Sequence, residues 1–441
     1  MGFLGNVLAF IFVLGVMVLV HELGHFLAAR LFDVKVDAFA LGMGPRLFGF
    51  RGKETDYKIC LLPIGGFVKM AGENPGEPAE SPRDFMAKPR WQRIIIALAG
   101  PVFNFALAVV LLVGLFMSQY KKPAFLQKPA VVGYVAADTG AAKAGVQRGD
   151  LLVAIDGTPT PDWDSVTFAT VATANSTIQV TVNRDGRELQ MPVSVGEEEL
   201  TGAGDPGWEY ETPVLLLLGE TEVGQPAEQA GVENGDRLVA VNDQPVYTSR
   251  QVPELVKALE GEEGQFEIER GTERLMLSIA PTYTDTNGGM WRIGVGLRPE
   301  FEIIETQLSF GDAVRESVNH NLKYSTLIFA TLRRLVVGQV SAESLEGPIG
   351  IARISGNAAR SSIPDLVMIM AIISLNLGIF NLLPIPILDG GVITMLLIES
   401  LMRRDLSLAF KERVLQVGFL FLILLFAYVM YNDIMKSFGP G

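Results

Sequence analysis

The sequence predicts a polytopic α-helical membrane protein with four transmembrane helices and two inserted copies of a small α+β domain. Three observations predict this fold class. Mean hydropathy is +0.31 although 19% of the residues are charged, so apolar and polar stretches must be segregated along the chain. Four apolar stretches reach the roughly 20 residues that a bilayer core requires. The long polar region between the second and third stretches contains an internal repeat.

The four expected spans run roughly over residues 2–29, 94–117, 366–383 and 414–430. A cleaved signal peptide needs a basic segment before its apolar run, and no Lys or Arg precedes Arg30. We therefore expect the first span to be retained. Lys and Arg are frequent in the loop between the first two spans and in the last loop, which places both loops in the cytoplasm. Both termini and the polar region then face outward.

Charge and cysteine content narrow the class of protein further. The formal net charge of −13 argues against a nucleic-acid partner. The single cysteine, Cys60, lies in the predicted cytoplasmic loop. No intrachain disulfide can therefore stabilise the outer region.

The outer region is duplicated. The stretch AAKAGVQRGD at residues 141–150 returns as AEQAGVENGD at residues 227–236, 86 positions later. Each copy reads as a short helix, a glycine turn and a half-buried strand. A period of this length suits two copies of a small domain, which we expect over residues 120–211 and 212–300. The pattern resembles the PDZ domain, which binds an extended peptide at a sheet edge. The alternative is a pair of spacers or gates that bind nothing tightly.

The first expected span carries a candidate metal site. His21 and His25 are four residues apart and therefore share one face of a helix, with Glu22 between them. This spacing can present two imidazoles to one zinc ion, with the glutamate available as a general base. Two of the three histidines of the chain belong to this pair, inside an apolar run. The alternative is that Glu22 lies near the helix end and reaches the cytoplasmic interface.

A catalytic zinc normally takes three protein ligands and a water. The third histidine, His320, lies in the outer region, on the wrong side of the membrane. Asp389 is the candidate for the third ligand, because it follows the third span where that span reaches the cytoplasmic side. Pro384 and Pro386 forbid continued helix there, and irregular backbone at membrane depth is tolerated only inside the protein or along a wet cavity.

Together these motifs resemble the site-2 protease family, the M50-type intramembrane zinc metalloproteases. The histidine motif and Leu388-Asp389-Gly390 lie on different spans, and Gly100-Pro-Val-Phe-Asn104 is similar to a further family element. Residues 39–45 and 62–69 resemble the membrane-associated β-hairpin of the family. Relatives often have His where this chain has Val392, which affects local tuning and not the metal ligands.

The resemblance implies a zinc metalloendopeptidase that cuts peptide bonds within transmembrane segments of single-span proteins, after their outer domain has been removed. Anti-sigma factors of the envelope stress response and remnant signal peptides are the substrates it implies. His21, His25 and Asp389 would hold the zinc, and Glu22 would be the catalytic base. Further residues would position the substrate: Asn376, Asn381, Pro384, Pro386, Gly65, Gly66 and Phe67. For Asn104 we favour interhelical hydrogen bonding instead.

We expect the remaining domains as follows. Residues 1–119 contain the first two spans and the hairpin, residues 301–365 a periplasmic helical brace, and residues 366–441 the last two spans. Residues 310–337 alternate apolar and basic positions at helical spacing, which predicts an amphipathic helix at the outer membrane surface or a brace. The resemblance implies a bacterial inner membrane, with the termini and PDZ domains in the periplasm. Partners would be membrane lipid and the substrate, whose new C-terminus the PDZ domains could contact.

Two other functions compete with this interpretation. The first is a non-catalytic membrane scaffold that presents two PDZ domains and has lost its active site. Retention of Glu22 and Asp389 argues against it, because polar residues at membrane depth are costly. The second is a membrane di-iron oxidase, whose sites need about eight histidines; the chain has three.

Overall fold

A computed structural model describes residues 2–74, 80–118, 120–171, 173–198, 203–217, 225–284, 289–338 and 347–438. The chain forms two compact units. Residues 1–120, 306–329 and 345–440 make the first, which is mainly helical. Residues 121–305 and 330–344 make the second, which is rich in β-strands. Each unit is described by itself.

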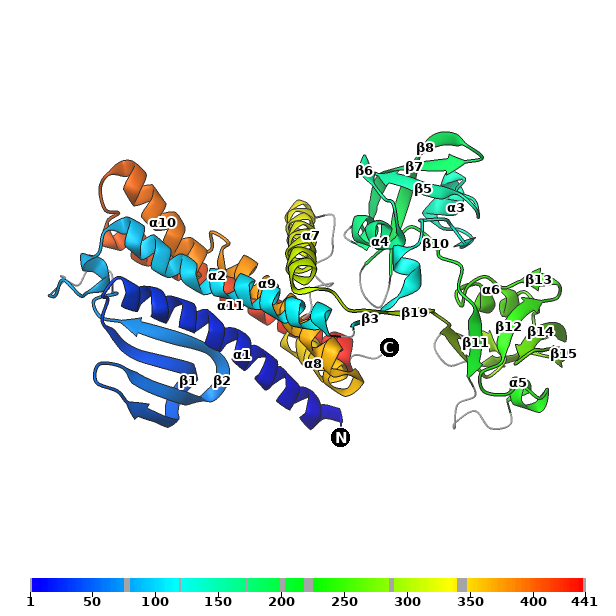
Figure 1. The fold of residues 1–441 in the computed structure, drawn as a ribbon, viewed down its shortest axis with the longest axis horizontal. Helices are drawn as coiled ribbons and strands as arrows, with labels where there is room; N and C mark the ends of the chain where they lie inside the picture. Colours follow the sequence, from blue (N-terminus) through cyan, green and yellow to red (C-terminus); the bar gives the residue numbers. More distant parts are fainter. Residues whose placement is uncertain are drawn as a thin grey trace. The chain divides into compact units, whose positions relative to one another are not determined.

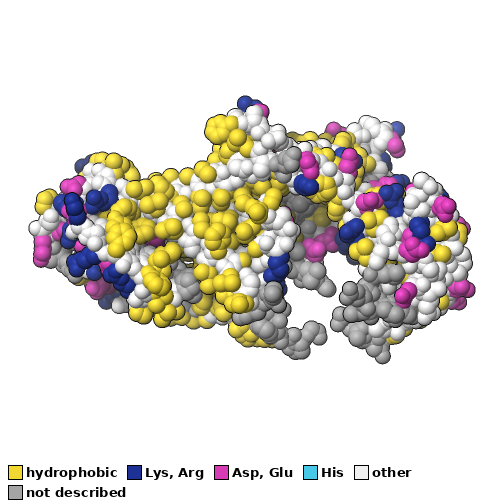
Figure 2. Space-filling view, turned by 60° about the horizontal axis from the view of Figure 1, so that its bottom comes forward, with side chains coloured by type: hydrophobic (Ala, Val, Ile, Leu, Met, Phe, Trp, Pro, Cys, Tyr) yellow, Lys and Arg dark blue, Asp and Glu magenta, His cyan; other side chains and the backbone are white. Residues whose placement is uncertain are grey.

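Within the described residues, four helices of the first unit are long and apolar enough to cross a membrane. They are α1 (Gly2–Leu31), α2 (Arg90–Met117), α9 (Ile363–Asn381) and α11 (Leu408–Phe438). Their outer surfaces carry exposed apolar side chains, for example Leu4 on α1 and Val417 on α11, each 68% exposed. Figure 2 shows apolar side chains over most of the helical part of one face. An apolar surface of this extent is typical of contact with lipid, and the predicted fold class is confirmed.

Three more helices accompany the spans, namely α7 (Phe310–Val337), α8 (Pro348–Ser361) and α10 (Asp389–Met402). The predicted helix over residues 310–337 is present as α7. Ala313 of α7 packs with Leu112 and Phe116 of α2 and with Ala371 of α9. The buried face of α7 therefore packs against two of the spans. Helix α10 was not expected from the sequence.

The segment between α1 and α2 forms a β-sheet beside α1 (Figure 1). Its two long strands, β1 (Val36–Arg51) and β2 (Asp56–Met70), both bend back on themselves. Residues 36–41 pair with residues 66–70 on one side and, from residue 38 onward, with residues 56–59 on the other. Residues 56–60 pair in turn with residues 46–51. The expected hairpin is therefore a sheet four segments wide, in which residues 66–70 form one edge.

The second unit contains two domains with the same order of elements. The first has β4 (Tyr134–Val135), α3 (Gly140–Ala144), β5 (Leu151–Ile155), β6 (Thr158–Pro159), α4 (Trp163–Val171), β7 (Ser176–Arg184) and β8 (Arg187–Glu197). The second has β11 (Val214–Leu217), α5 (Pro226–Gln229), β12 (Arg237–Val241), β13 (Gln244–Pro245), α6 (Gln251–Lys257), β14 (Gly264–Arg270) and β15 (Glu273–Ile279). Each domain closes over an apolar core of its own.

Shorter strands complete the second unit. They are β9 (Gly204–Asp205), β10 (Trp208–Glu209), β16 (Thr282–Thr284), β17 (Met290–Arg292) and β18 (Gly296–Pro299). Strand β10 pairs with β4 in the first domain, and β18 pairs with β11 in the second. Strand β19 (Ile303–Thr306) pairs with β3 (Tyr120–Pro123).

Matching ion pairs support the duplication. Arg184 donates two hydrogen bonds of 2.7 Å to the buried carboxylate of Asp150. Arg270 and Asp236 make the same paired contact at 2.8 Å, 86 positions later. In the first domain this pair links the residue just before β5 to the last residue of β7, and in the second it links the residue just before β12 to the last residue of β14. The two copies therefore share internal contacts as well as sequence.

Candidate active site

Helix α1 places three polar side chains on one buried face. His21, Glu22 and His25 are 8%, 9% and 8% exposed. The imidazole rings lie edge to face with centroids 4.8 Å apart, and their Nε2 atoms are 3.2 Å from each other. The i, i+4 spacing of a helix accounts for this stacking of the two rings.

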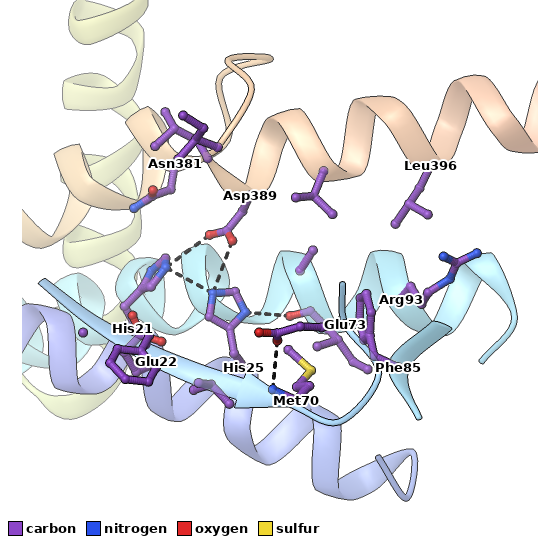
Figure 3. Close-up of a pocket in the computed structure, with 18 of the residues that line it drawn as sticks. His21, Glu22, His25, Met70, Glu73, Phe85, Arg93, Asn381, Asp389 and Leu396 are labelled. Atoms are coloured by element: carbon purple, nitrogen blue, oxygen red, sulfur yellow. Dashed lines mark hydrogen bonds and ion pairs between the residues drawn. The ribbon is translucent and has the colours of Figure 1, made fainter. Parts of the chain in front are cut away.

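The segment between α9 and α10 brings Asp389 to the same point (Figure 3). Its Oδ2 lies 3.1 Å from Nε2 of His21, and its Oδ1 lies 3.4 Å from Nε2 of His25. Pro384 and Pro386 prevent α9 from continuing. Ile387 has a φ of 87°, which is unusual for a β-branched residue and stores about 1–3 kcal/mol of strain beside the site. Asp389 is the first residue of α10, not part of a loop.

Groups on α2 orient both imidazoles. Nδ1 of His25 lies 2.8 Å from the carbonyl oxygen of Ile96 and donates its hydrogen to it. Nδ1 of His21 lies 3.1 Å from the side-chain amide of fully buried Asn104. The amide oxygen of Asn104 has no hydrogen-bond partner among the described residues. Turning the amide over places that oxygen on Nδ1–H of His21, which leaves both Nε2 lone pairs directed at Asp389.

Two glycines allow α1 and α2 to approach this closely. A Cβ atom on Gly24 would lie 2.4 Å from the carbonyl oxygen of Ala99. A Cβ atom on Gly100 would lie 2.3 Å from Nε2 of His25 and 2.8 Å from Cε1 of His21. Small residues at such contacts are typical of packed membrane helices. Here they also bring the carbonyl of Ile96 and the amide of Asn104 within reach of the imidazoles.

The donor set fits a metal ion. One ligand atom from each of His21, His25 and Asp389 lies within 4.8 Å of the other two. Oδ2 of Asp389 is buried without a hydrogen bond among the described residues, and two imidazole lone pairs that face a carboxylate repel one another and it unless they share a cation or a proton. Two imidazoles and one carboxylate leave a fourth position open for water, as catalytic zinc sites require.

A cavity of about 690 Å³ opens beside these ligands. Glu22 lines it, and Gly66 of β2 lies so close to Glu22 that an added Cβ would meet Cγ of that side chain at 2.9 Å. The last segment of β2, residues 65–68 and Met70, forms one wall. This segment pairs only with residues 36–41 in the described sheet, so it lines the cavity as an edge segment whose other side has no strand.

The predicted substrate-positioning residues divide into two groups. Gly65, Gly66, Phe67 and Asn381 line the cavity. Asn376, Pro384 and Pro386 are not among its lining residues in the described part of the chain. The amide of Asn381 donates to the carbonyl of Leu377 at 2.9 Å, and Pro386 packs on Gly418 of α11.

Several residues at this site were not selected from the sequence. Asn104 was assigned to interhelical hydrogen bonding; it does bridge two spans, but its partner is a candidate metal ligand. Glu73, Arg93 and Glu399 also line the cavity. Glu399 interrupts a largely apolar stretch and Arg93 directly precedes one, which is the signal that could have drawn attention to them.

The fold and the site together define a membrane-embedded metal-dependent hydrolase. Comparison with known proteins gives its family: residues 9–425 match the model of peptidase family M50. The chain therefore belongs to peptidase family M50, whose members are zinc metalloproteases. This membership argues against the non-catalytic scaffold, as does the presence of all three candidate metal ligands.

Similar proteins cover the chain almost from end to end. It is 32% identical to the regulator of sigma-E protease RseP of Escherichia coli strain K12, over 98% of this chain and 99% of that protein. It is 32% identical to the regulator of sigma E protease of Salmonella typhimurium strain LT2, over 98% of each. Protease RseP of Yersinia pestis is 31% identical, over 98% and 99%. This chain is thus a multi-pass M50 metalloprotease of the RseP type.

One similar solved structure covers a fifth of the chain. The crystal structure of the PDZ domain of an SdrC-like protein from Listeria monocytogenes is 17% identical, with a TM-score of 0.18. It covers 20% of this chain and 90% of that domain.

Proposed function

We propose that this protein is a zinc endopeptidase that hydrolyses a peptide bond inside the transmembrane segment of a single-span protein. The convergence of His21, His25, Asp389 and Glu22 on one cavity between membrane spans carries this proposal. His21, His25 and Asp389 would hold the zinc ion. When bound there, zinc lowers the pKa of a coordinated water to about 7 and polarises the scissile carbonyl.

Glu22 would take the proton from the attacking water and return it to the leaving nitrogen. Its carboxylate lines the cavity next to both imidazoles, and it is not needed as a ligand. Asn104 and the carbonyl of Ile96 would keep each imidazole in the tautomer whose Nε2 is free. Burial of these groups excludes bulk water from all but the cavity side of the site.

The substrate must be extended before its backbone can be cut, because the carbonyls of a helix are already hydrogen-bonded. The edge segment formed by residues 66–70 supports a route for this. An unwound segment of the substrate could add to this edge as a further strand, with main-chain hydrogen bonds holding it beside Glu22. Asn381 faces the same cavity and would contact the segment from the opposite wall. Asn376, Pro384 and Pro386 would act indirectly, through the shape of the α9–α10 connection.

The bacterial relatives support a location in the inner membrane. With the basic loops in the cytoplasm, the active site would lie toward the cytoplasmic side, and the PDZ domains and both termini would lie in the periplasm. The PDZ domains would contact the outer part of the substrate or its newly formed C-terminus. An anti-sigma factor already shortened by another protease is the substrate class that the RseP relatives favour, with remnant signal peptides as a second class.

The test is cleavage of a purified single-span substrate by the parent and by the Glu22→Gln variant, both in detergent. We expect the parent to cut within the apolar span, as located by mass spectrometry of the products. The variant should lose at least 10²-fold in rate, because general base catalysis contributes 10²–10⁴-fold, and it should still bind zinc. Equal cleavage by the two proteins would refute the proposed mechanism.

A further inference from the structure

The cavity extends past the metal ligands to a second group of polar side chains. Arg93 of α2 and Glu399 of α10 line its far end, together with Glu73 and Lys411. Figure 3 shows Arg93 beside Leu396, away from the two histidines along α10. The proposed reaction leaves these side chains without a role.

Arg93 is buried and incompletely hydrogen-bonded. It is 6% exposed, and among the described residues its hydrogen bond, from Nη1, reaches the sulfur of Met86 at 3.2 Å. Its Nε has no acceptor among the described residues. Arg93 also makes no ion pair with any described residue. A buried guanidinium normally has a carboxylate or carbonyl partner. Arg93 therefore has donors available to a molecule in the cavity.

Glu399 offers the complementary acceptor. It is 1% exposed. Its Oε1 accepts from Lys411 at 2.6 Å and from the backbone amide of Leu406 at 3.0 Å. Its Oε2 has no hydrogen-bond donor among the described residues, since Nε of Arg90 lies 3.8 Å away.

The part of the cavity beside Arg93 and Glu399 is called the gap below. The charges around it favour a neutral occupant. Arg90 and Lys411 lie against Glu399, at 3.8 and 2.6 Å, and Arg90 also pairs with Asp405. Together with Arg93 and Glu73, basic and acidic side chains are therefore equal in number around the gap, so that an occupant of either charge would meet its own sign. Burial raises the pKa of the Glu73 carboxyl group, which accepts from the amide of Met70 at 2.8 Å. A hydroxyl or carboxamide, which both accepts and donates, satisfies the free atoms on both sides without an excess charge.

The geometry also gives a distance from the metal ligands. Leu396 follows Asp389 by seven residues and Glu399 follows it by ten, so the gap lies about 10–15 Å along α10 from the metal ligands. The edge segment 66–70 runs along the same cavity, from Glu22 toward Glu73. A substrate strand on that edge advances about 3.3 Å per residue and covers this distance in about three to five residues.

From this we infer that Arg93 and Glu399 form a polar subsite for a hydroxyl or carboxamide side chain of the substrate, about three to five residues from the scissile bond. The inference rests on the proposed function and adds a sequence preference to it. Such a side chain can offer an acceptor to Arg93 and a donor to Glu399. The preferred residue would lie on the side of the bond that extends toward Arg93.

The test compares threonine with valine at each substrate position from two to seven residues on either side of the cut. The two residues are β-branched and of similar size, so they loosen a helix alike and differ mainly by the hydroxyl. We expect the parent to cut the threonine substrate about three- to tenfold faster at one position on the Arg93 side, the value of one or two hydrogen bonds. Ratios near one at every position would overturn the subsite while leaving the protease function intact.

The second arm repeats the comparison with the Arg93→Met variant, whose fold is checked by thermal unfolding. The threonine preference at that position should fall to near one, whereas an unchanged ratio would assign the preference to another residue and overturn the inference. The substrate series in the parent decides the question alone if the variant does not fold. Failure of the parent to cut any substrate in a Glu22-dependent way would instead refute the proposed function, and the subsite with it.

Discussion

Replacement of Gly100 by alanine tests the geometry of the metal ligands without removing any of them. The added methyl carbon would lie 2.3 Å from Nε2 and 2.6 Å from Cε1 of His25, and 2.8 Å from Cε1 of His21. Ordinary contacts between such atoms are about 3.5 Å, so the imidazole of His25 must move by about 1 Å. Metal ligands are held to about 0.2 Å, and a 1 Å displacement at a reacting centre costs about 10²-fold in rate.

The matched control is Gly114→Ala on the same helix. A Cβ atom on Gly114 meets nothing within 4 Å, and alanine is favoured over glycine in a helix by about 1 kcal/mol. We expect Gly100→Ala to bind zinc poorly and to lose about 10²-fold in kcat/KM, while Gly114→Ala matches the parent. Cleavage assays measure kcat/KM, elemental analysis measures zinc content, and thermal unfolding checks that both variants are folded. If Gly100→Ala kept parental activity and zinc content, the close approach of α1 and α2 at the site would be wrong.

Three further predictions concern other contacts. Asn104→Ala should weaken zinc binding about 10- to 100-fold in a chelator competition, because His21 loses the group that orients it; unchanged affinity would contradict this. Burial raises the pKa of Asp236, but the hydrogen bonds from Arg270 and a backbone amide outweigh it, so the pKa lies below its usual range. Its stabilising effect is complete above pH ~4 and is lost as pH falls through the folded-state pKa, so an Asp236→Asn variant should show a weaker loss of thermal stability between pH 5 and 2 than the parent. Asp433, 2% exposed, accepts from two amides at the start of α8, and Asp433→Ala should destabilise that helix by about 1–2 kcal/mol, seen as faster proteolysis at α8; equal proteolysis would count against the contact.

The spans and the histidine pair were predictable because their signals are local. A run of about 20 apolar residues marks a span wherever it occurs, and the spacing of His21 and His25 fixes their common face on a helix. Asp389 was found by a local anomaly, the two prolines that interrupt an apolar stretch. The internal repeat was equally visible, since it only requires comparison of one stretch of the chain with another.

Features that depend on distant pairing were not predictable. The strand segments around residues 36–70 are recognisable, but their register, which leaves residues 66–70 as an edge beside Glu22, follows from tertiary packing. Asn104 could be assigned to interhelical bonding, yet only the structure identifies His21 as its partner. Arg93 and Glu399, which line the same part of the cavity, are 306 positions apart in the sequence. Helix α10 was missed because its first turn contains Gly390 and Gly391, which usually argue against a helix.

The central claim is that His21, His25 and Asp389 hold one zinc ion that Glu22 uses without binding it. Elemental analysis of the purified parent and of the Glu22→Gln and Asp389→Ala variants tests it most directly. We predict roughly one zinc per chain in the parent and in Glu22→Gln, and much less in Asp389→Ala, as expected when one of three protein ligands is removed. A parent without zinc, or an Asp389→Ala variant that retains a full equivalent, would contradict the assignment of the site.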